Sequence, residues 1–303
     1  MTDMTEFQSK MTSLLPDVKL IPGELMAKHT SFRIGGPAEV MAFPKNAEEL
    51  SKLLKVSALL DCKPAILGAG TNILAPDAGI PGLVICLKDC MDGLSQTNET
   101  TIRAAAGVTM TRAAVYAAGL GLSGLEFSHG IPGSVGGGVY MNAGAYGGEI
   151  RNVCTRVGIM NPDGTAEELT GEEMQFSYRH SVLEDRNAIV LWAEFTLTPG
   201  DPDTIRAKMK ELMAKRSASQ PLDMPSAGSA FKRPVGGYAA ALIEQAGLKG
   251  FTMGHAGISS KHAGFAVNLG GATAEEVQNL LREVSDRVYE NSGIRLEPEV
   301  RIW

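Results

Sequence analysis

The chain has 303 residues with a net charge of −6, and glycine (35 residues) exceeds its usual share while proline (15 residues) does not. Glycine excess without proline excess argues against collagen, and 44% hydrophobic residues argue against a mainly disordered chain. The acidic balance argues against nucleic acid or a membrane surface as partner. No apolar run reaches the ~18 residues of a membrane span, and the first twenty residues lack the pattern of a signal peptide. We therefore expect a cytoplasmic protein of two domains.

The first 88 residues have the pattern of an α/β lobe. Leu50, Leu53 and Leu54 recur at helical spacing, and short apolar runs before and after them are typical of strands. The predicted elements are a leader helix with its connection (1–28), a strand (38–44), a helix (46–60) and two strands (64–67 and 82–87).

A second lobe is predicted for residues 89–214. Gly119 and Gly121 end a predicted helix that follows a strand. The predicted elements are a strand (101–108), a helix (109–118), the glycine-rich segment (130–138), three strands (153–160, 166–170 and 188–198) and a helix (203–217). Pro221 and Pro225 then mark a linker, and we divide the chain into domains 1–214 and 215–303.

The C-terminal 89 residues predict a small α+β domain. Thr273 and Glu276 form a capping box before a helix that Gly293 ends. The predicted elements are a strand or loop (228–234), a helix (238–246), two strands (251–258 and 264–269), a helix (274–291) and a final strand (295–303).

The cysteines and histidines do not predict a metal site. Cys86 and Cys90 are spaced C-x3-C, but no second close pair completes a zinc set. The five histidines show no metal-binding pair on a helix. Reduced, mostly buried thiols are the expected state of these cysteines in the cytoplasm.

Two glycine segments point to a nucleotide cofactor. Gly68-Ala69-Gly70-Thr71-Asn72 follows a strand, but it lacks the lysine of a P-loop and could be an ordinary turn. The segment from Gly130 to Gly138, GIPGSVGGG, has five glycines and only Ser134 as a polar side chain. Such a segment favours close backbone approach to a flat or phosphorylated ligand. Together the two segments predict two sides of one cofactor.

These segments also carry a resemblance. GAGTN with GIPGSVGG and MNAGAYGGE resembles the FAD-binding domain of the vanillyl-alcohol-oxidase (PCMH) type. The chain as a whole is similar to the UDP-N-acetylenolpyruvoylglucosamine reductase (UDP-N-acetylmuramate dehydrogenase, MurB) family, in its shorter second subtype. The similarity extends from HTSFRIGG to LEPEV and includes YRHS, GSAFK and SKHAGF, which covers about nine-tenths of the chain in the right order.

The resemblance implies an α+β fold, with a two-lobed FAD-binding domain and a small substrate domain. It implies a flavoprotein oxidoreductase of peptidoglycan precursor synthesis, and so of cell wall biogenesis, cell shape and cell division. Hydride would pass from NADPH to noncovalent FAD and on to the vinyl carbon of UDP-N-acetylglucosamine enolpyruvate. The protein would be a monomer whose partners are small molecules.

Three positions match the catalytic residues of the family. Ser229 would protonate the enolate, and Arg179 would bind the carboxylate through two parallel hydrogen bonds. Glu299 matches the catalytic glutamate, with either a raised pKa or a pairing with Arg179. Spacing alone does not separate Glu299 from Glu297, because residues two apart in a strand point to the same face. Without the resemblance, each of these residues would more often be structural.

The resemblance also assigns binding residues. The cofactor positions are Gly68, Ala69, Gly70, Thr71, Asn72, Gly130, Ile131, Pro132, Gly133, Ser134, Gly136, Gly137, Asn142 and Ala143. The substrate positions are Tyr178, Lys232, Arg233, Lys261, His262 and Asn268, of which the lysines suit a diphosphate.

Three matters stay open at this point. A flavin tether through His29 or Cys154 is not decided by the sequence, and a substrate-clamping role for Tyr238 is in doubt because the longer subtype's extra segments are missing. An FAD-dependent oxidase of another small substrate is the first alternative. A nucleotide-sensing module that has lost its chemistry is the second, and it is disfavoured by the presence of Arg179, Ser229 and Glu299.

Overall fold

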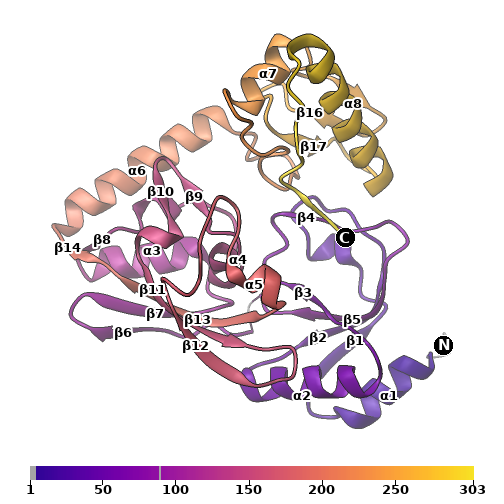
Figure 1. The fold of residues 1–303 in the computed structure, drawn as a ribbon, viewed down its shortest axis with the longest axis vertical. Helices are drawn as coiled ribbons and strands as arrows, with labels where there is room; N and C mark the ends of the chain where they lie inside the picture. Colours follow the sequence, from indigo (N-terminus) through magenta and orange to yellow (C-terminus); the bar gives the residue numbers. More distant parts are fainter. Residues whose placement is uncertain (1–4, 89) are drawn as a thin grey trace. The chain divides into compact units, whose positions relative to one another are not determined.

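The computed structural model describes residues 5–88 and 90–303, which form two compact units (Figure 1). The first unit comprises Met1–Pro22, Glu39–Ala69 and Gly82–Lys215, as far as these residues are described. The second comprises Gly23–Ala38, Gly70–Pro81 and Arg216–Trp303. It therefore contains two N-terminal segments that the sequence analysis placed in domain 1–214. No helix in the described part of the chain is long and apolar enough to cross a membrane.

The N-terminal part of the first unit is a four-stranded sheet covered by helices. The sheet has the order β1-β2-β5-β3, where β1 is antiparallel to β2 and β3 is parallel to β5. Met11, Leu50 and Leu53 join the helices to one core beneath it, and α1 and α2 lie side by side in Figure 1. The elements are α1 (Glu6–Leu14), β1 (Lys19–Pro22), β2 (Ala38–Phe43), α2 (Ala47–Leu59), β3 (Ala65–Leu67) and β5 (Ile80–Cys86).

The rest of the first unit is built on an antiparallel sheet of order β12-β11-β13-β7-β6. One face packs against α3, α4 and their loops in the largest core cluster. The strands are β6 (Leu94–Asn98), β7 (Thr101–Ala105), β11 (Cys154–Met160), β12 (Ala166–Thr170) and β13 (Ile189–Thr196). The helices are α3 (Met110–Gly119), α4 (Val135–Tyr140), α5 (Val182–Arg186) and α6 (Pro202–Ser219), and the two-residue strands are β8 (Leu122–Ser123), β9 (Gly144–Ala145), β10 (Gly148–Glu149) and β14 (Thr198–Pro199).

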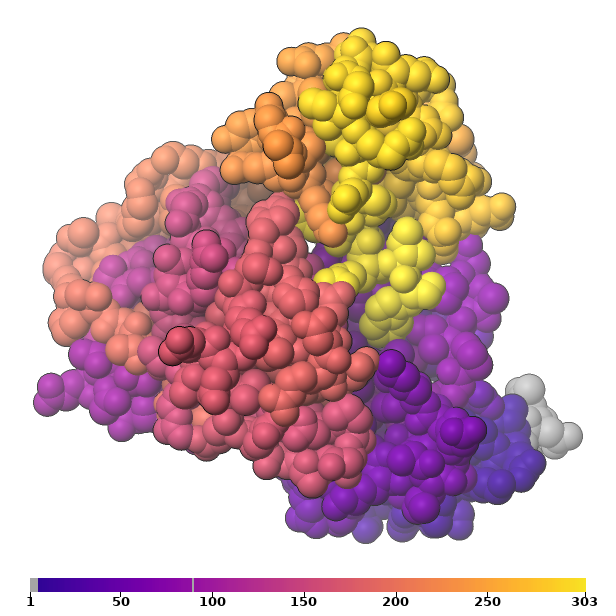
Figure 2. All heavy atoms as spheres, in the orientation of Figure 1, coloured from indigo at the N-terminus to yellow at the C-terminus, as the bar shows by residue number. Residues whose placement is uncertain are grey.

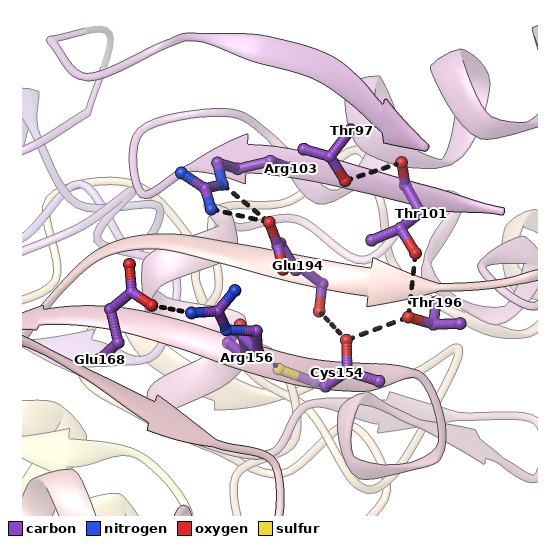
Figure 3. A network of polar contacts seen from close by, with 9 residues as sticks. Thr97, Thr101, Arg103, Cys154, Arg156, Glu168, Glu194 and Thr196 are labelled. Atoms are coloured by element: carbon purple, nitrogen blue, oxygen red, sulfur yellow. Dashed lines mark hydrogen bonds and ion pairs between the residues drawn. The ribbon is translucent and has the colours of Figure 1, made fainter. Parts of the chain in front are cut away.

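A network of charged and hydroxyl groups runs across strands of this second sheet (Figure 3). Glu194 lies opposite both Arg103 and Arg156 in the strand register, and Arg103 donates to it through Nε (3.0 Å) and Nη2 (2.7 Å). The Arg103 guanidinium also stacks 3.7 Å from the centre of the Trp192 ring. Opposite charges on facing strands stabilise the pairing. This network therefore supports the sheet that carries α4.

The second unit has a compact core of helices around a small sheet. The sheet has the order β15-β16-β17, and α7 and α8 pack with it in one cluster that also contains Phe32, Leu74 and Val300. The elements are β4 (Ile73–Leu74), α7 (Ala239–Gln245), β15 (Thr252–Met253), β16 (Ala256–Ile258), β17 (Ala266–Asn268), α8 (Ala274–Ser292) and β18 (Arg301–Ile302). In Figure 2 the orange and yellow atoms of the C-terminal residues gather in one body.

Long-range contacts explain why residues 70–81 belong to this second unit. Asp77 accepts from the amides of Ala274 (2.8 Å) and Glu275 (3.1 Å) at the start of α8, so it caps a helix 197 residues away. The strand β18 pairs with β4 in parallel. The predicted capping box of Thr273 and Glu276 at the same helix is confirmed.

Two predicted strands are wrong, and a helix in the glycine-rich segment was not predicted. The single strand predicted at 251–258 is two short strands, β15 and β16, which pair antiparallel. Within the glycine-rich segment, residues from Val135 to Tyr140 form the helix α4. The predicted final strand 295–303 is reduced to β18, preceded by an isolated bridge between Phe231 and Pro298. Pro298 has no N–H for a regular ladder, which explains the interruption.

Candidate active site

The two glycine segments meet in the first unit. A Cβ atom at Gly68 would lie 2.8 Å from the Ser134 hydroxyl oxygen, which is closer than real side chains come. The Ser134 hydroxyl caps α4 by accepting from the amide of Gly137 (3.4 Å). Gly68 therefore lets the first segment lie directly against the start of the helix in the second.

The three consecutive glycines of α4 have different reasons to be glycine. A Cβ at Gly136 would lie 3.0 Å from the Ala106 Cβ, and one at Gly138 would lie 2.7 Å from the Met110 sulfur. Gly137 is exposed, and its Cβ would meet only the Ser134 hydroxyl, at 3.6 Å. Glycine inside a helix costs about 1 kcal/mol relative to alanine. Packing within the chain does not account for that cost at Gly137, whereas close approach of a ligand would.

The backbone amides narrow the place where a phosphate would bind. The amides of Val135, Gly136 and Gly138 are already bonded to carbonyls of Val108, Ala106 and Ser134. Several amides of the two segments, among them those of Gly68, Ala69, Gly70 and Gly133, donate to no acceptor in the described part of the chain. The expected anion-binding backbone therefore includes the first segment and Gly133, rather than the whole of the segment 130–138.

Gly70 and Asn72 hold the end of the first glycine segment within the second unit, Gly70 close to His29 and Asn72 at the end of the chain. Gly70 has φ +63°, and a Cβ there would lie 2.0 Å from the His29 carbonyl oxygen. Asn72 donates from Nδ2 to the Glu299 carbonyl (3.2 Å), and its own carbonyl accepts from the amide of Arg301 (2.9 Å). The side chain of Asn72, a predicted cofactor residue, therefore supports the segment that contains Glu299.

Asn142 is 1% exposed and has φ +42°. Its Nδ2 donates to Glu149 Oε2 (2.8 Å) and to the Ser177 carbonyl (3.0 Å), and its Oδ1 accepts from the amide of Arg151 (3.0 Å). Both amide hydrogens are therefore used inside the first unit. The backbone amides of Asn142 and Ala143 are also bonded, to the carbonyls of Val139 (3.1 Å) and Gly138 (2.8 Å), so no amide of these two predicted cofactor residues is left for a ligand.

Arg179 lies in a tight turn of the first unit, between α4 and α5. Ser177 and His180 exchange backbone hydrogen bonds (3.1 and 3.3 Å) around Tyr178 and Arg179. Arg179 has φ +58°, a left-handed conformation that is unfavourable for a residue with a side chain. Its guanidinium lies 4.9 Å from the centre of the Tyr178 ring, and Tyr178 is 51% exposed. Backbone strain of this kind is often found at functional residues.

Ser229 and Glu299 are brought together within the second unit, although 69 residues separate them in the sequence. Ser229 bridges to Phe265 on one side, and the neighbouring Ala230 carbonyl accepts from the amide of Glu299 (2.9 Å) on the other. In the described part of the chain, the Ser229 hydroxyl has no hydrogen-bond partner. A half-buried hydroxyl on a backbone held from both sides is well suited to meet a substrate.

Glu299 and Glu297 differ in burial, which their spacing could not show. Glu299 is half-buried, whereas the side chain of Glu297 is 74% exposed. Glu297 pairs with Lys232, with 3.3 Å between Oε2 and Nζ. The half-buried position favours Glu299 for a role at a substrate.

The two predicted substrate lysines differ in their partners. Lys232 forms the exposed pair with Glu297, and Lys261 donates from Nζ to the Ser217 carbonyl (2.6 Å). Exposed ion pairs contribute about 0–1 kcal/mol, so the Lys232 ammonium could exchange Glu297 for a phosphate at little cost. The Lys261 ammonium would have to give up its bond to the Ser217 carbonyl.

His262 and Asn268 are more constrained. Burial lowers the pKa of His262, and its Nδ1 accepts from the amide of Gly264 (3.1 Å). At neutral pH His262 is therefore a neutral ring that donates through Nε2, and not a cation. Asn268 is 6% exposed; its Nδ2 donates to the Phe32 carbonyl (3.0 Å) and its Oδ1 accepts from the amides of Gly270 and Ala272. Asn268 was predicted to contact the substrate, and in the structure its side-chain amide links segments of the second unit.

The described residues favour neither a flavin tether at Cys154 nor a metal site. Burial raises the pKa of the Cys154 thiol to about 12, so a reactive thiolate is disfavoured there. His29 Nε2 lies 2.9 Å from Glu24 Oε1. The described residues contain no cluster of three or more His, Cys, Asp or Glu that could hold a metal ion.

Sequence reasoning missed Ser177, Ser181 and Glu149, which surround the Arg179 turn. Ser181 is fully buried and donates from Oγ to the Tyr140 carbonyl (2.7 Å). Ser177 and Ser181 act through contacts 35 and 41 residues apart, and Glu149 contacts Asn142, seven residues before it. The motif YRHS contains Ser181 and the motif MNAGAYGGE contains Glu149, but no motif contains Ser177.

Two family models match the chain. Residues 38–170 match the FAD binding domain, and residues 220–303 match the C-terminal domain of UDP-N-acetylenolpyruvoylglucosamine reductase. The predicted FAD-binding domain and α+β fold are confirmed by these matches together with the structural similarity below.

Named relatives cover nearly the whole chain. A UDP-N-acetylenolpyruvoylglucosamine reductase of Agathobacter rectalis is 45% identical over 98% of both chains, and one of Latilactobacillus sakei is 46% identical over 92% of this chain and 91% of the other. The crystal structure of the reductase from Thermus caldophilus, at 35% identity, has a TM-score of 0.80 and covers 94% of this chain and 98% of the other. The chain therefore belongs to the UDP-N-acetylenolpyruvoylglucosamine reductase family, the FAD-dependent oxidoreductases of peptidoglycan precursor synthesis.

Proposed function

We propose that the protein reduces the enolpyruvyl ether of UDP-N-acetylglucosamine enolpyruvate to the lactyl ether of UDP-N-acetylmuramate, with NADPH as the hydride donor. The observation that carries the proposal is the end-to-end match to named reductases, 45% identical over 98% of both chains. Arg179, Ser229 and Glu299 stand at the positions that the resemblance assigns to catalysis. The substrate combines a diphosphate, a carboxylate and a vinyl carbon, and each needs a different group of the protein.

FAD would bind without a covalent bond in the first unit, where Gly68 meets Ser134. The exposed Gly137 leaves space for its close approach, and the amides of Ala69 and Gly133 offer donors for its phosphates. The bound flavin would supply the hydride that the vinyl carbon receives. Asn142 and Ala143 remain predictions for the cofactor, since the amide groups of Asn142 are bonded within the first unit.

Arg179 would bind the carboxylate of the enolpyruvyl group. A guanidinium donates two parallel hydrogen bonds to a carboxylate and stays protonated at any working pH. As hydride arrives at the vinyl carbon, negative charge moves toward this carboxylate. The cation then binds the transition state more strongly than the ground state, which is the requirement for catalysis.

Ser229 would give the proton that completes the reduction. The Ser229 Oγ–H bond breaks, a C–H bond forms at the carbon next to the carboxylate, and the resulting alkoxide recovers its proton from water or a neighbouring acid. Its unbonded hydroxyl and its backbone, held on both sides, support this role. Glu299, held to Ala230 through its amide, would lie near the same carbon.

Lys232 and Lys261 would bind the diphosphate of the nucleotide, with His262 as a neutral donor through Nε2. Tyr178 and Arg233 remain predictions for the same substrate. Arg233 stacks 4.2 Å from the ring centre of Tyr238, which is 62% exposed.

We further propose that the protein acts as a cytoplasmic monomer, without nucleic acid. NADPH and nucleotide-linked sugars are intracellular metabolites, and the net charge of −6 disfavours polyanions. A single mass near 32.0 kDa by light scattering would support the monomer. A dimer at the same concentration would contradict it.

The function is tested by product analysis. The purified protein is incubated with NADPH and UDP-N-acetylglucosamine enolpyruvate, and the sugar nucleotide is analysed by mass spectrometry. The proposal predicts a product with two more hydrogens and one NADPH consumed per product. Unchanged sugar nucleotide with NADPH-independent oxygen consumption on an alcohol or hydroxy acid would instead indicate an oxidase.

A further inference from the structure

We propose that Asn142 and Ser181 are positioning residues that hold the Arg179 turn against the end of α4. The inference rests on the proposed role of Arg179 at the substrate carboxylate, and it gives Asn142 a function that differs from cofactor binding. All the residues involved lie in the first unit.

The turn is held at both ends. Before Arg179, the Ser177 carbonyl accepts from Asn142 Nδ2 at 3.0 Å. After Arg179, the Ser181 hydroxyl donates to the Tyr140 carbonyl at 2.7 Å. Tyr140 is the last residue of α4 and Asn142 follows it by two residues, so both contacts come from the C-terminal end of α4 and the residues just beyond it.

Burial makes these contacts strong and specific. Asn142 is 1% exposed and Ser181 is 0% exposed, so water does not compete for either side chain. Ser181 precedes α5, but its side chain makes no capping bond to that helix. Its hydroxyl therefore serves the contact with Tyr140.

Asparagine fits position 142 for three reasons. Its Oδ1 accepts from the Arg151 amide, and its second Nδ2 hydrogen goes to Glu149 Oε2, at 2.8 Å. An aspartate would place its charge against the Glu149 carboxylate and the Ser177 carbonyl. The backbone at 142 also has φ +42°, which asparagine tolerates better than most residues.

The clamp matters because Arg179 is in an unfavourable conformation. A left-handed arginine persists only when its surroundings hold it there, and without the clamp the turn can relax to another geometry. The guanidinium would then no longer lie where the carboxylate needs it. A displacement of about 1 Å can slow a reaction ~10²-fold.

The test separates the two half-reactions of the holoenzyme without oxygen. Asn142→Ala, Ser181→Ala and Arg179→Ala are each compared with the wild type. We measure flavin content, the rate of flavin reduction by NADPH, and the rate of flavin reoxidation by saturating UDP-N-acetylglucosamine enolpyruvate. Asn187→Ala is the matched control, because Asn187 is also a left-handed asparagine (φ +51°) but ends α5 and accepts from Lys63.

We expect Asn142→Ala to slow reoxidation ~10- to 100-fold and Ser181→Ala ~10-fold, while flavin content and reduction stay at the wild-type level. In the Arg179→Ala background, Asn142→Ala should add less than about twofold, because the residue that it positions is already gone. Asn187→Ala should reoxidise at the wild-type rate.

Three results would overturn the proposal. Wild-type reoxidation in both single variants, with only a lower melting temperature, would make the clamp merely structural. A full additional loss in the double variant would mean that Asn142 acts independently of Arg179. If Arg179→Ala itself reoxidises normally, its proposed role at the carboxylate fails, and the positioning role fails with it. If Asn142→Ala does not fold, Ser181→Ala, which removes a single hydrogen bond, decides the question by the same criteria.

Discussion

The α4 segment of the first unit and the loop 228–237 of the second are both rich in glycine, but for different reasons. Around α4, Cβ atoms at Gly68, Gly136 and Gly138 would lie 2.7 to 3.0 Å from neighbouring atoms. In the loop, Cβ atoms at Gly228, Gly236 and Gly237 would meet nothing within 4 Å. Glycine serves close packing in the first region and leaves open space in the second, where Ser229 lies.

Gly137 is the exception inside the packed region, since its position is exposed and almost free of contacts. Packing requires glycine at Gly136 and Gly138 but not at Gly137, so the three consecutive glycines have different roles. It also gives the proposed cofactor position a test that does not depend on catalysis.

The largest effect is expected at Ser229, in the open region. Removing the proton donor by Ser229→Ala should lower kcat ~10²- to 10⁴-fold, which is the usual contribution of general acid catalysis. Flavin reduction by NADPH should not change, because that step needs no proton from Ser229. Stopped-flow absorbance measures both, with Ser95→Ala, an exposed serine of β6, as the control. Normal turnover in Ser229→Ala would remove Ser229 as the acid.

The next effect is expected at Gly68, in the packed region. A methyl group there would displace the Ser134 hydroxyl and break the cap of α4, so Gly68→Ala should cost about 1–3 kcal/mol of the free energy of unfolding. Urea unfolding of the apoprotein measures the loss. Ser134→Ala, which removes the cap without the clash, should cost about 1 kcal/mol. Equal stability of Gly68→Ala and the wild type would mean that the two glycine segments do not meet as described.

Gly137→Ala should separate cofactor binding from stability. Alanine is the better helix former, so the apoprotein should be as stable as the wild type or more stable by up to about 1 kcal/mol. FAD affinity should fall about tenfold, as measured by titration of the apoprotein. Gly237→Ala is the matched control in the open loop, with no expected change in FAD affinity. Wild-type affinity in Gly137→Ala would place the cofactor elsewhere.

The smallest effect concerns the pH dependence of stability. Because burial lowers the pKa of folded His262, the unfolded chain takes up a proton first as the pH falls below about 6.5. The stabilisation is complete above that pH and declines below it, until the folded pKa is reached. His262→Gln should therefore lose less stability than the wild type between pH 7.5 and 5.5, as measured by urea unfolding. An identical loss in both proteins would show that His262 titrates normally when folded.

Much of the fold could be predicted from local patterns. The spacing of Leu50, Leu53 and Leu54 predicted α2, and the capping box of Thr273 predicted α8. The helix α4 was missed because three consecutive glycines disfavour a helix. Hydrogen bonds from Val135 and Gly136 to distant carbonyls outweigh that preference, and no local pattern shows them.

The candidate site was predicted by motif matching and only partly by physical reasoning. The meeting of Gly68 with Ser134, the different burial of Glu297 and Glu299, and the neutral state of His262 all depend on packing between distant segments. The assignment of residues 70–81 to the second unit depends likewise on Asp77, which caps a helix 197 residues away. Sequence spacing carries no information about such contacts.

The central claim is that the flavin bound by the first unit reduces an enolpyruvyl substrate. The most direct measurement reduces the purified protein with a slight deficit of NADPH in the absence of oxygen, then adds UDP-N-acetylglucosamine enolpyruvate and follows the flavin absorbance band. The account predicts that the band bleaches and then returns rapidly on addition of the substrate. A band that stays bleached until air enters would contradict the substrate assignment, and a protein without any flavin band would contradict the cofactor site.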